Sequence, residues 1–128
     1  MNLLVDTCAF LWLASDHALL SAPARRALAD GGNEYWLSEV SILEITLKWT
    51  AQKLGLPRPP RRWVEEELER WQIARLPLRV GDIYRMSELP RYHQDPFDRL
   101  LVAQALEHGL TVLTPDAAIA RYPVDTLW

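Results

Sequence analysis

Residues 92–116 read YHQDPFDRLLVAQALEHGLTVLTPD and contain the signals for a helix followed directly by a buried strand. Asp95 has the side chain of a helix N-cap, Pro96 suits the first helical position, and Gly109 suits the position just after the last turn. The apolar run that follows is typical of a short buried strand and ends near Asp116. This stretch therefore predicts the helix–strand unit from which α/β folds are built.

The rest of the chain repeats this alternation. The expected strands are residues 2–6, 34–38, 73–78 and 110–114, with a last edge strand at 124–128. The expected helices are residues 7–14, 21–30, 62–71, 80–89, 96–108 and 117–121, and one that begins at Ser38 or Ser41 and ends at Gly55. Strands that are nearly continuous apolar runs are typical of a parallel sheet covered on both faces. We predict an α/β fold with a central parallel sheet of four to five short strands and helices on both faces.

The size and composition of the chain are those of one ordinary globular domain. With 128 residues, of which 49% are hydrophobic and 24% charged, we expect residues 1–128 to form a single domain. The single cysteine, Cys8, excludes an internal disulfide, and no Cys/His pair has the spacing of a structural zinc site. The apolar start lacks a basic segment and is interrupted by Asp6, so we expect no signal peptide, no membrane span and a cytoplasmic location.

The charge of the chain gives an ambiguous signal about nucleic acids. The net charge of −3 is not that of a typical nucleic-acid-binding protein. Arginines nevertheless crowd the middle of the sequence, where glutamates interleave with them: Arg58, Arg61, Arg62, Arg70, Arg75, Arg79, Arg85 and Arg91. A solvated helix face crossed by salt bridges is the favoured interpretation of this segment.

Four carboxylates are expected at one edge of the sheet. Asp6 and Asp116 follow two predicted strands, and ligand sites of open α/β sheets lie outside the carboxyl ends of strands. Asp98 opens the helix before the second of these strands, and Glu44 lies in the third helix. Carboxylates that converge repel one another and persist mainly around a cation, for which Mg²⁺ or Mn²⁺ is suited. The implied chemistry is metal-assisted hydrolysis of a phosphodiester.

Each of these acids also has a purely structural interpretation. Asp6 and Asp116 are suited to cap the helices that follow them, and Asp98 is favourable in the first turn of a helix. Glu44 is four residues before Lys48, a spacing at which the two side chains pair on an exposed helix. The order of the acids along an alternating α/β chain, rather than any single one, carries the prediction of a site.

Three segments, LLVDTCAFLWL (3–13), SILEITLK (41–48) and residues 93–116, together resemble the PIN-domain ribonucleases, specifically the VapC-type toxins of type II toxin-antitoxin systems. The resemblance spans nearly the whole chain. It implies an Mg²⁺- or Mn²⁺-dependent endoribonuclease that cleaves RNA, is silenced by a cognate antitoxin and forms a homodimer. The catalytic and metal-binding acids that it implies are Asp6, Glu44, Asp98 and Asp116.

The resemblance extends less specifically to five further positions. Thr7 and Thr114 match polar positions that flank the site in relatives. Lys48 and Arg99 match basic positions that could hold a phosphate. Asp95 occupies a position that is often acidic, and we assign it a capping role first, with a role near the metal as the alternative.

Two other functions compete with this prediction. A phosphatase of the haloacid-dehalogenase type would use Asp6 as a nucleophile, but it requires a second aspartate two residues later, where this chain has Cys8. A catalytically silent PIN-like binding module would not need the full set of acids.

The chain also has six tryptophans, more than a core of this size easily encloses. We predict that residues 10–13 and 45–49 flank an exposed groove for the antitoxin, with burial in the core as the alternative.

Overall fold

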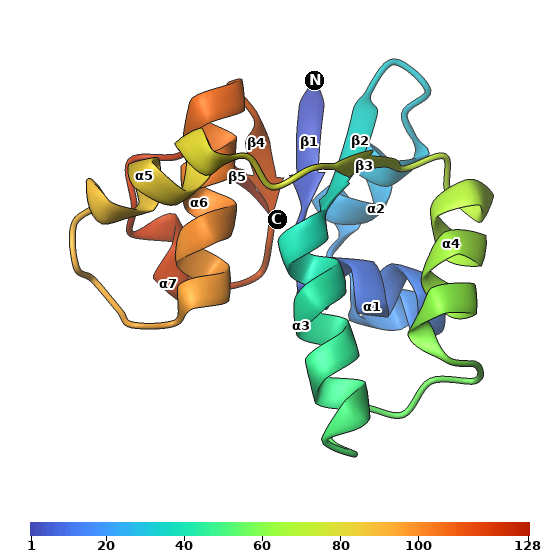
Figure 1. Ribbon diagram of the computed structural model, residues 1–128. Helices are drawn as coiled ribbons and strands as arrows, with labels where there is room; N and C mark the ends of the chain where they lie inside the picture. Colours follow the sequence, from blue (N-terminus) through green and yellow to red (C-terminus); the bar gives the residue numbers. More distant parts are fainter.

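The computed structural model describes residues 1–128, and one or more helices separate each strand from the next along the chain (Figure 1). The strands are β1 (Asn2–Val5), β2 (Glu34–Ser38), β3 (Ala74–Leu76), β4 (Thr111–Leu113) and β5 (Thr126–Leu127). The helices are α1 (Thr7–Ser15), α2 (Ala22–Ala29), α3 (Glu39–Thr50), α4 (Pro60–Arg70), α5 (Val80–Ser87), α6 (Pro96–His108) and α7 (Ala117–Ala120). A short 3₁₀ helix, η1 (His17–Leu19), was not predicted.

The five strands form one parallel sheet in the order β3-β2-β1-β4-β5. The chain moves outward from the central strand β1 through β2 to β3, and then crosses to the other side of β1 to form β4 and β5. The sheet therefore has its topological switch point between β1 and β4, where ligand sites of such sheets are found. The register pairs Val5 with Leu113, so these two strands end side by side.

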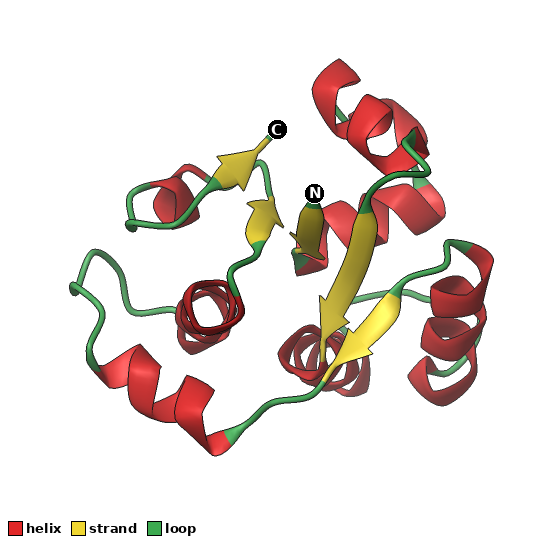
Figure 2. Ribbon diagram, turned by 90° about the horizontal axis from the view of Figure 1, so that it is seen from above, coloured by secondary structure: helices red, strands yellow, loops and turns green.

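Helices cover both faces of the sheet, as predicted (Figure 2). On one face, Val5, Leu37 and Leu113 belong to an apolar core shared with α1, α2 and α4. On the other face, Leu4 and Val112 belong to a core shared with α5, α6 and α7. These strand residues are fully buried, which is why the strands read as nearly continuous apolar runs. The predicted α/β fold is confirmed.

Helix α3 contributes to both cores. Val40 near its start packs in one core and Ile45 packs in the other. Ser38 caps the helix through a bond from the Val40 N–H (2.9 Å), so α3 begins immediately after β2 and continues beyond the carboxyl edge of the sheet (Figure 1). This placement brings the middle of α3 to the switch point.

The predicted end of this helix at Gly55 was wrong, because α3 ends at Thr50. Gln52 adopts a left-handed backbone conformation with φ of 60°, and the Lys53 N–H bonds to the Lys48 carbonyl (2.8 Å). This hydrogen bond reaches five residues back, instead of the four of a regular α-helix, and ends the helix as in a Schellman motif, without the usual glycine.

The expected groove between residues 10–13 and 45–49 was largely wrong. Phe10 and Ile45 are completely buried and Leu13 is nearly so, because they fill the core under α1 and α3. On the outer surface of α3, Trp49 retains 37% of its exposure and Leu47 retains 50%. An exposed apolar surface therefore exists on α3, but it does not extend to the inner side of α1.

The arginine-rich middle of the chain is mostly neutralised, as the favoured interpretation predicted. Arg58 and Arg62 both pair with Glu66, at 2.6 and 3.1 Å, and Arg75 pairs with Glu65. Helix α4 begins at Pro60, two residues before the expected start, since proline is well suited to the first helical turn. None of the helices in the structure combines the length and the apolar character that a membrane span requires.

Candidate active site

Asp6 stands at the carboxyl end of the central strand and is only 4% exposed. Its backbone N–H extends the pairing of β1 with β4 by donating to the Leu113 carbonyl (3.1 Å). Its carboxylate caps α1, because Oδ1 accepts a hydrogen bond from the Ala9 N–H (2.7 Å). The capping interpretation and the site interpretation of Asp6 are therefore compatible, since the same carboxylate caps the helix and faces the switch point.

A single hydroxyl group connects Asp6 to Asp116. Thr114 Oγ1 donates to Oδ2 of Asp6 and accepts a hydrogen bond from the Asp116 N–H (3.0 Å). Asp116 in turn caps α7 by accepting from the Ala118 N–H (2.8 Å). Thr114, predicted as a polar position flanking the site, thus fixes the two aspartates on opposite sides of the switch point.

Glu44 reaches the same region from α3 and is 7% exposed. Its Oε2 accepts a hydrogen bond from Lys48 Nζ at 2.9 Å, so the i,i+4 pair considered from the sequence is present. The pair is not on an outer surface, however, because both residues line the pocket described below. Thr7 Oγ1 donates to Ser41 Oγ (2.9 Å) and so ties the start of α1 to the start of α3.

Asp95 and Asp98 approach from the first turn of α6. Asp95 caps this helix, with Oδ1 accepting from the Phe97 N–H at 2.9 Å and from the Asp98 N–H at 3.4 Å. Oδ2 of Asp98 lies 3.3 Å from Nε2 of His93. The other ring nitrogen of His93 contacts the Tyr122 hydroxyl at 2.8 Å. The orientation of His93, and with it that of Asp98, is therefore fixed by the last segment of the chain.

These side chains surround one pocket of about 550 Å³, here called the acid pocket. Its lining residues are Asp6, Thr7, Cys8, Leu11, Trp12, Glu44, Lys48, Asp95, Asp98, Pro115 and Asp116. The structure thus brings together all four acids predicted as catalytic, together with Thr7, Lys48 and Asp95. Thr114 lies directly behind them, bonded to Asp6.

Burial and mutual repulsion disfavour the ionised forms of two of these acids. The pKa of Asp6 is raised to about 6, first by burial and further by the charges of Asp116 and Glu44, although the bonds from Thr114 and Ala9 oppose this shift. The pKa of Asp98 is also raised to about 6, by burial and by the charge of Asp95, while His93 lowers it. The acid pocket is therefore electrostatically strained at neutral pH, and a bound cation would relieve the strain.

The donor set fits a hard divalent cation, but the acids are not arranged as a ready metal site. All the candidate ligands are carboxylate oxygens, which suit Mg²⁺ or Mn²⁺. No group of three His, Cys, Asp or Glu side chains is close enough together to hold a metal ion as they stand. Each carboxylate instead accepts a hydrogen bond from the protein, such as that from Lys48 to Glu44 or from Thr114 to Asp6.

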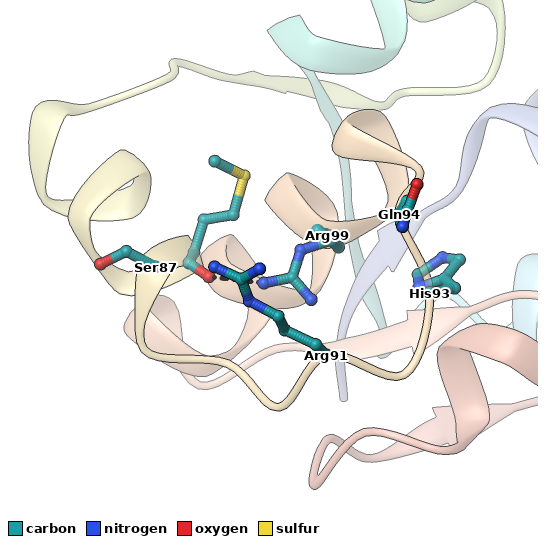
Figure 3. Close-up of a pocket in the computed structure, with 6 residues that line it drawn as sticks. Ser87, Arg91, His93, Gln94 and Arg99 are labelled. Carbon is teal, nitrogen blue, oxygen red and sulfur yellow. Dashed lines mark hydrogen bonds between the residues drawn. The ribbon is translucent and has the colours of Figure 1, made fainter.

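Arg99, expected near the site as a phosphate-binding group, does not line the acid pocket. Its guanidinium donates to the carbonyls of Pro90 (2.8 Å) and Met86 (3.1 Å) and to the Tyr122 hydroxyl (3.0 Å). It lines an adjacent pocket, which His93 also lines (Figure 3). His93 and Tyr122 were not predicted as site residues. The only signal for His93 in the sequence was a polar residue in the loop before α6.

Comparisons with known proteins agree with this architecture. The sequence model of the PIN domain matches residues 3–125. Comparison with curated protein sequences finds no match. Among solved structures, the chain is similar to one in the crystal structure of VapBC2 from Rickettsia felis bound to a DNA fragment from their promoter. That match has a TM-score of 0.72 and 13% identity, and it covers 98% of this chain and 97% of the other.

Two further structures are similar. DNA-bound VapBC from Salmonella typhimurium gives a TM-score of 0.69 at 14% identity, covering 98% of this chain and 96% of the other. The PIN domain endonuclease Utp24 gives a TM-score of 0.51 at 16% identity, covering 94% of this chain and 74% of the other. At identities this low, the likeness is one of fold.

Proposed function

Because this chain belongs to the PIN-domain family, we propose that it is a metal-dependent endoribonuclease and the toxin of a type II toxin-antitoxin pair. The observation that carries the proposal is the convergence of Asp6, Glu44, Asp98 and Asp116 on one pocket at the switch point of the sheet. Carboxylates are otherwise costly in such a buried place, and the protein provides too few positive groups within the pocket to neutralise them.

The four acids would hold Mg²⁺ or Mn²⁺, with Asp6 and Asp116 as the most firmly fixed ligands. When bound, the ion polarises a phosphodiester and lowers the pKa of a water molecule. Thr114 keeps the two aspartates in place through its hydroxyl group. His93 favours the ionised form of Asp98, because its ring nitrogen faces Oδ2 of this carboxylate and lowers its pKa.

Lys48 has a separate role at the mouth of the acid pocket. Its side chain is 52% exposed, although Nζ is bonded to the buried Glu44. A cation in this position partly offsets the negative charge that an approaching phosphate would meet. In the proposed enzyme, Lys48 therefore assists entry of the RNA backbone and restrains Glu44 until the metal is bound.

The proposed protein partners are a cognate antitoxin and a second copy of this chain. Two of the structures named above as similar in fold are VapBC complexes. Exposed apolar side chains include Leu43 and Leu47 on α3, and Val80, Ile83 and Tyr84 on α5. Apolar residues on adjacent turns of a helix support a protein partner at each surface. Sedimentation of the purified protein, alone and with its antitoxin, tests these assemblies.

An RNA cleavage assay tests the enzymatic function. With Mg²⁺ or Mn²⁺ the protein should cleave RNA, and excess chelator or Asp116→Asn should remove this activity. Asp125→Asn makes the same change at an exposed position outside the acid pocket and should cleave normally. Calcium should bind without supporting comparable turnover, because its larger and looser coordination shell positions water and phosphate poorly. Full cleavage in excess chelator would refute metal dependence, and RNA binding without cleavage would indicate a silent binding module.

A further inference from the structure

A second pocket, of about 400 Å³, lies beside the acid pocket and is not used by the proposed chemistry. Its lining residues are Met86, Ser87, Arg91, His93, Gln94 and Arg99, from the end of α5, the loop 88–95 and the first turn of α6 (Figure 3). His93 links the two pockets, since it lines this one while its Nε2 faces Asp98 of the acid pocket at 3.3 Å. We call this second pocket the arginine pocket.

The arginine pocket is positively charged, and its charges are not neutralised by the protein. Neither Arg91 nor Arg99 forms an ion pair with a carboxylate. Arg99 is held entirely by neutral acceptors, namely two carbonyls and one hydroxyl, so its full positive charge remains. Figure 3 shows both guanidinium groups reaching toward the same part of the pocket. This differs from α4, where Arg62 and Arg70 each pair with a glutamate.

An exposed aromatic side chain adjoins this charge. Tyr92, between Arg91 and His93, is 41% exposed, and the guanidinium of Arg121 lies 4.9 Å from the centre of its ring. Arg121 also forms no ion pair with a carboxylate and donates to the Tyr92 carbonyl at 3.3 Å. Arginines interleaved with an exposed aromatic ring are typical of surfaces that bind single-stranded nucleic acid, where charge tracks the backbone and the ring stacks a base.

We propose that the arginine pocket binds a second phosphate of the single-stranded RNA whose scissile linkage occupies the acid pocket, and that Tyr92 stacks with a nearby base. The inference rests on the proposed nuclease function and names the part of the protein that holds the substrate. Arginine is suited to this task because its planar group donates two parallel hydrogen bonds to a phosphate.

Electrostatics gives the physical reason for a second site. An RNA strand is a polyanion, and the acid pocket presents five carboxylates against one lysine. The net charge of the chain is also negative, at −3, so the protein as a whole does not attract RNA. Unpaired arginines directly beside the acids provide the local attraction that positions the strand, and the metal then has to offset only the charge at the scissile phosphate.

Arg91 is the residue to test, because it is exposed and makes no hydrogen bond that the fold requires. Binding is measured with a fluorescent oligouridylate of about 12 nucleotides in the cleavage-deficient Asp116→Asn background, with Mg²⁺ present, between about 50 and 200 mM salt. Adding Arg91→Ala should weaken binding by roughly 3- to 10-fold and reduce the slope of log K against log salt by about 0.7, the value for one lost contact to a single-stranded phosphate. Arg91→Lys, which keeps the charge but loses the planar donor pair, should show an intermediate loss.

Arg61→Ala is the matched control, since Arg61 is exposed, lies in the first turn of α4 outside both pockets and forms no ion pair. It should leave affinity and salt slope unchanged. If Arg91→Ala binds RNA as Arg61→Ala does, the inference is wrong, and normal RNA cleavage by the unsubstituted protein would leave the nuclease proposal standing. If Arg91→Ala instead weakens binding of an oligoglutamate peptide and not of RNA, the arginine pocket is a protein-docking site and the inference is also overturned. Absence of both RNA binding and RNA cleavage in the unsubstituted protein would contradict the nuclease function itself.

Discussion

Asp6 and Asp82 are two aspartates buried to nearly the same extent, with 4% and 1% exposure, in opposite electrostatic surroundings. Asp82, in the first turn of α5, is surrounded by donors: its Oδ2 accepts from the Arg79 N–H (2.9 Å) and from Gln104 Nε2 (3.2 Å), and its Oδ1 lies 3.0 Å from His108 Nε2. Asp6 also has two donors, but burial raises its pKa, and the negative charges of Asp116 and Glu44 raise it further.

The two carboxylates therefore have different roles. Asp82 stabilises the fold through its hydrogen bonds, whereas Asp6 is held in position by the fold. The bonds of Asp82 join α5 to α6, and Gln104 extends the network to the Pro77 carbonyl (3.1 Å) and to Ser38 at the end of β2. Each partner of Asp82 presents a nitrogen atom at hydrogen-bond distance from its carboxylate. Around Asp6 two donors favour the charged form, but burial and the charges of Asp116 and Glu44 oppose it, so the site is a cost to the metal-free protein that a bound cation relieves.

The largest expected effect is on RNA cleavage, and it concerns Asp6. Asp6→Asn should reduce RNA cleavage at least about 100-fold, as expected for the loss of a group that fixes the catalytic ion. The variant should remain folded, because asparagine also caps helices. Steady-state cleavage rates, with circular dichroism as the check on folding, measure this. A variant that cleaves normally would mean that Asp6 only caps α1.

Removal of the Asp82 carboxylate should affect stability instead of chemistry. Asp82→Ala leaves the Arg79 N–H, Gln104 and His108 without their acceptor in a buried place, and should lower the free energy of unfolding by about 3–5 kcal/mol. Urea denaturation measures the loss, and Asp125→Ala, at an exposed position, is the control, with a change below about 0.5 kcal/mol. A loss of cleavage in Asp82→Ala that exceeds its unfolded fraction would contradict a purely structural role.

The next effect is a pH dependence of stability that is specific to the acid pocket. Because burial raises the pKa of Asp6 from 3.8 to about 6, the folded metal-free protein holds this proton more tightly than the unfolded chain does. The contribution of Asp6 to stability should therefore be most favourable below pH 4 and fall by about 1–3 kcal/mol as the pH rises to 7. Asp98, whose pKa is raised in the same way, adds to the trend.

The difference in unfolding free energy between the unsubstituted protein and Asp6→Asn isolates this contribution, when both are measured in chelator from pH 4 to 7. The asparagine variant should become relatively more stable as the pH rises. Asp125→Asn, measured in parallel, should keep the full slope of the unsubstituted protein. A pH-independent difference between Asp6→Asn and the unsubstituted protein would show that folding does not raise the pKa of Asp6.

The parts of the molecule that sequence predicted well are those set by local chemistry. The bounds of β2 and α6 match the prediction, because Gly109 and the Asp95–Pro96 pair define where α6 ends and begins. The convergence of the acids was also predictable, since parallel strands place their carboxyl ends at one edge of a sheet. Their roles as metal ligands stay a prediction.

The parts that sequence did not predict depend on contacts between distant segments. Arg99 turns away from the acid pocket because the Pro90 and Met86 carbonyls accept its hydrogen bonds, and no local pattern encodes that direction. Asp82 gave no signal beyond an acid in a helix, because its side-chain partners come from α6, more than twenty residues away. The end of α3 was misplaced because a residue other than glycine adopts the left-handed conformation that terminates it.

The smallest effect concerns Lys48, the only positive side chain that lines the acid pocket. Because its pair with Glu44 is half exposed, Lys48→Met should lower the stability of the metal-free protein by less than about 1 kcal/mol. The same change frees Glu44 and removes a positive charge, so Mg²⁺ or Mn²⁺ should bind roughly 2- to 5-fold more tightly, while the RNA concentration at half-maximal rate should increase. Calorimetric titration with Mn²⁺ measures the first change and cleavage kinetics the second. Lys53→Met removes an exposed lysine beyond the end of α3 and should alter neither. Weaker metal binding in Lys48→Met would mean that Lys48 holds Glu44 in the orientation that the ion needs, and the acid pocket would then resemble the Asp82 network more closely than its charges suggest.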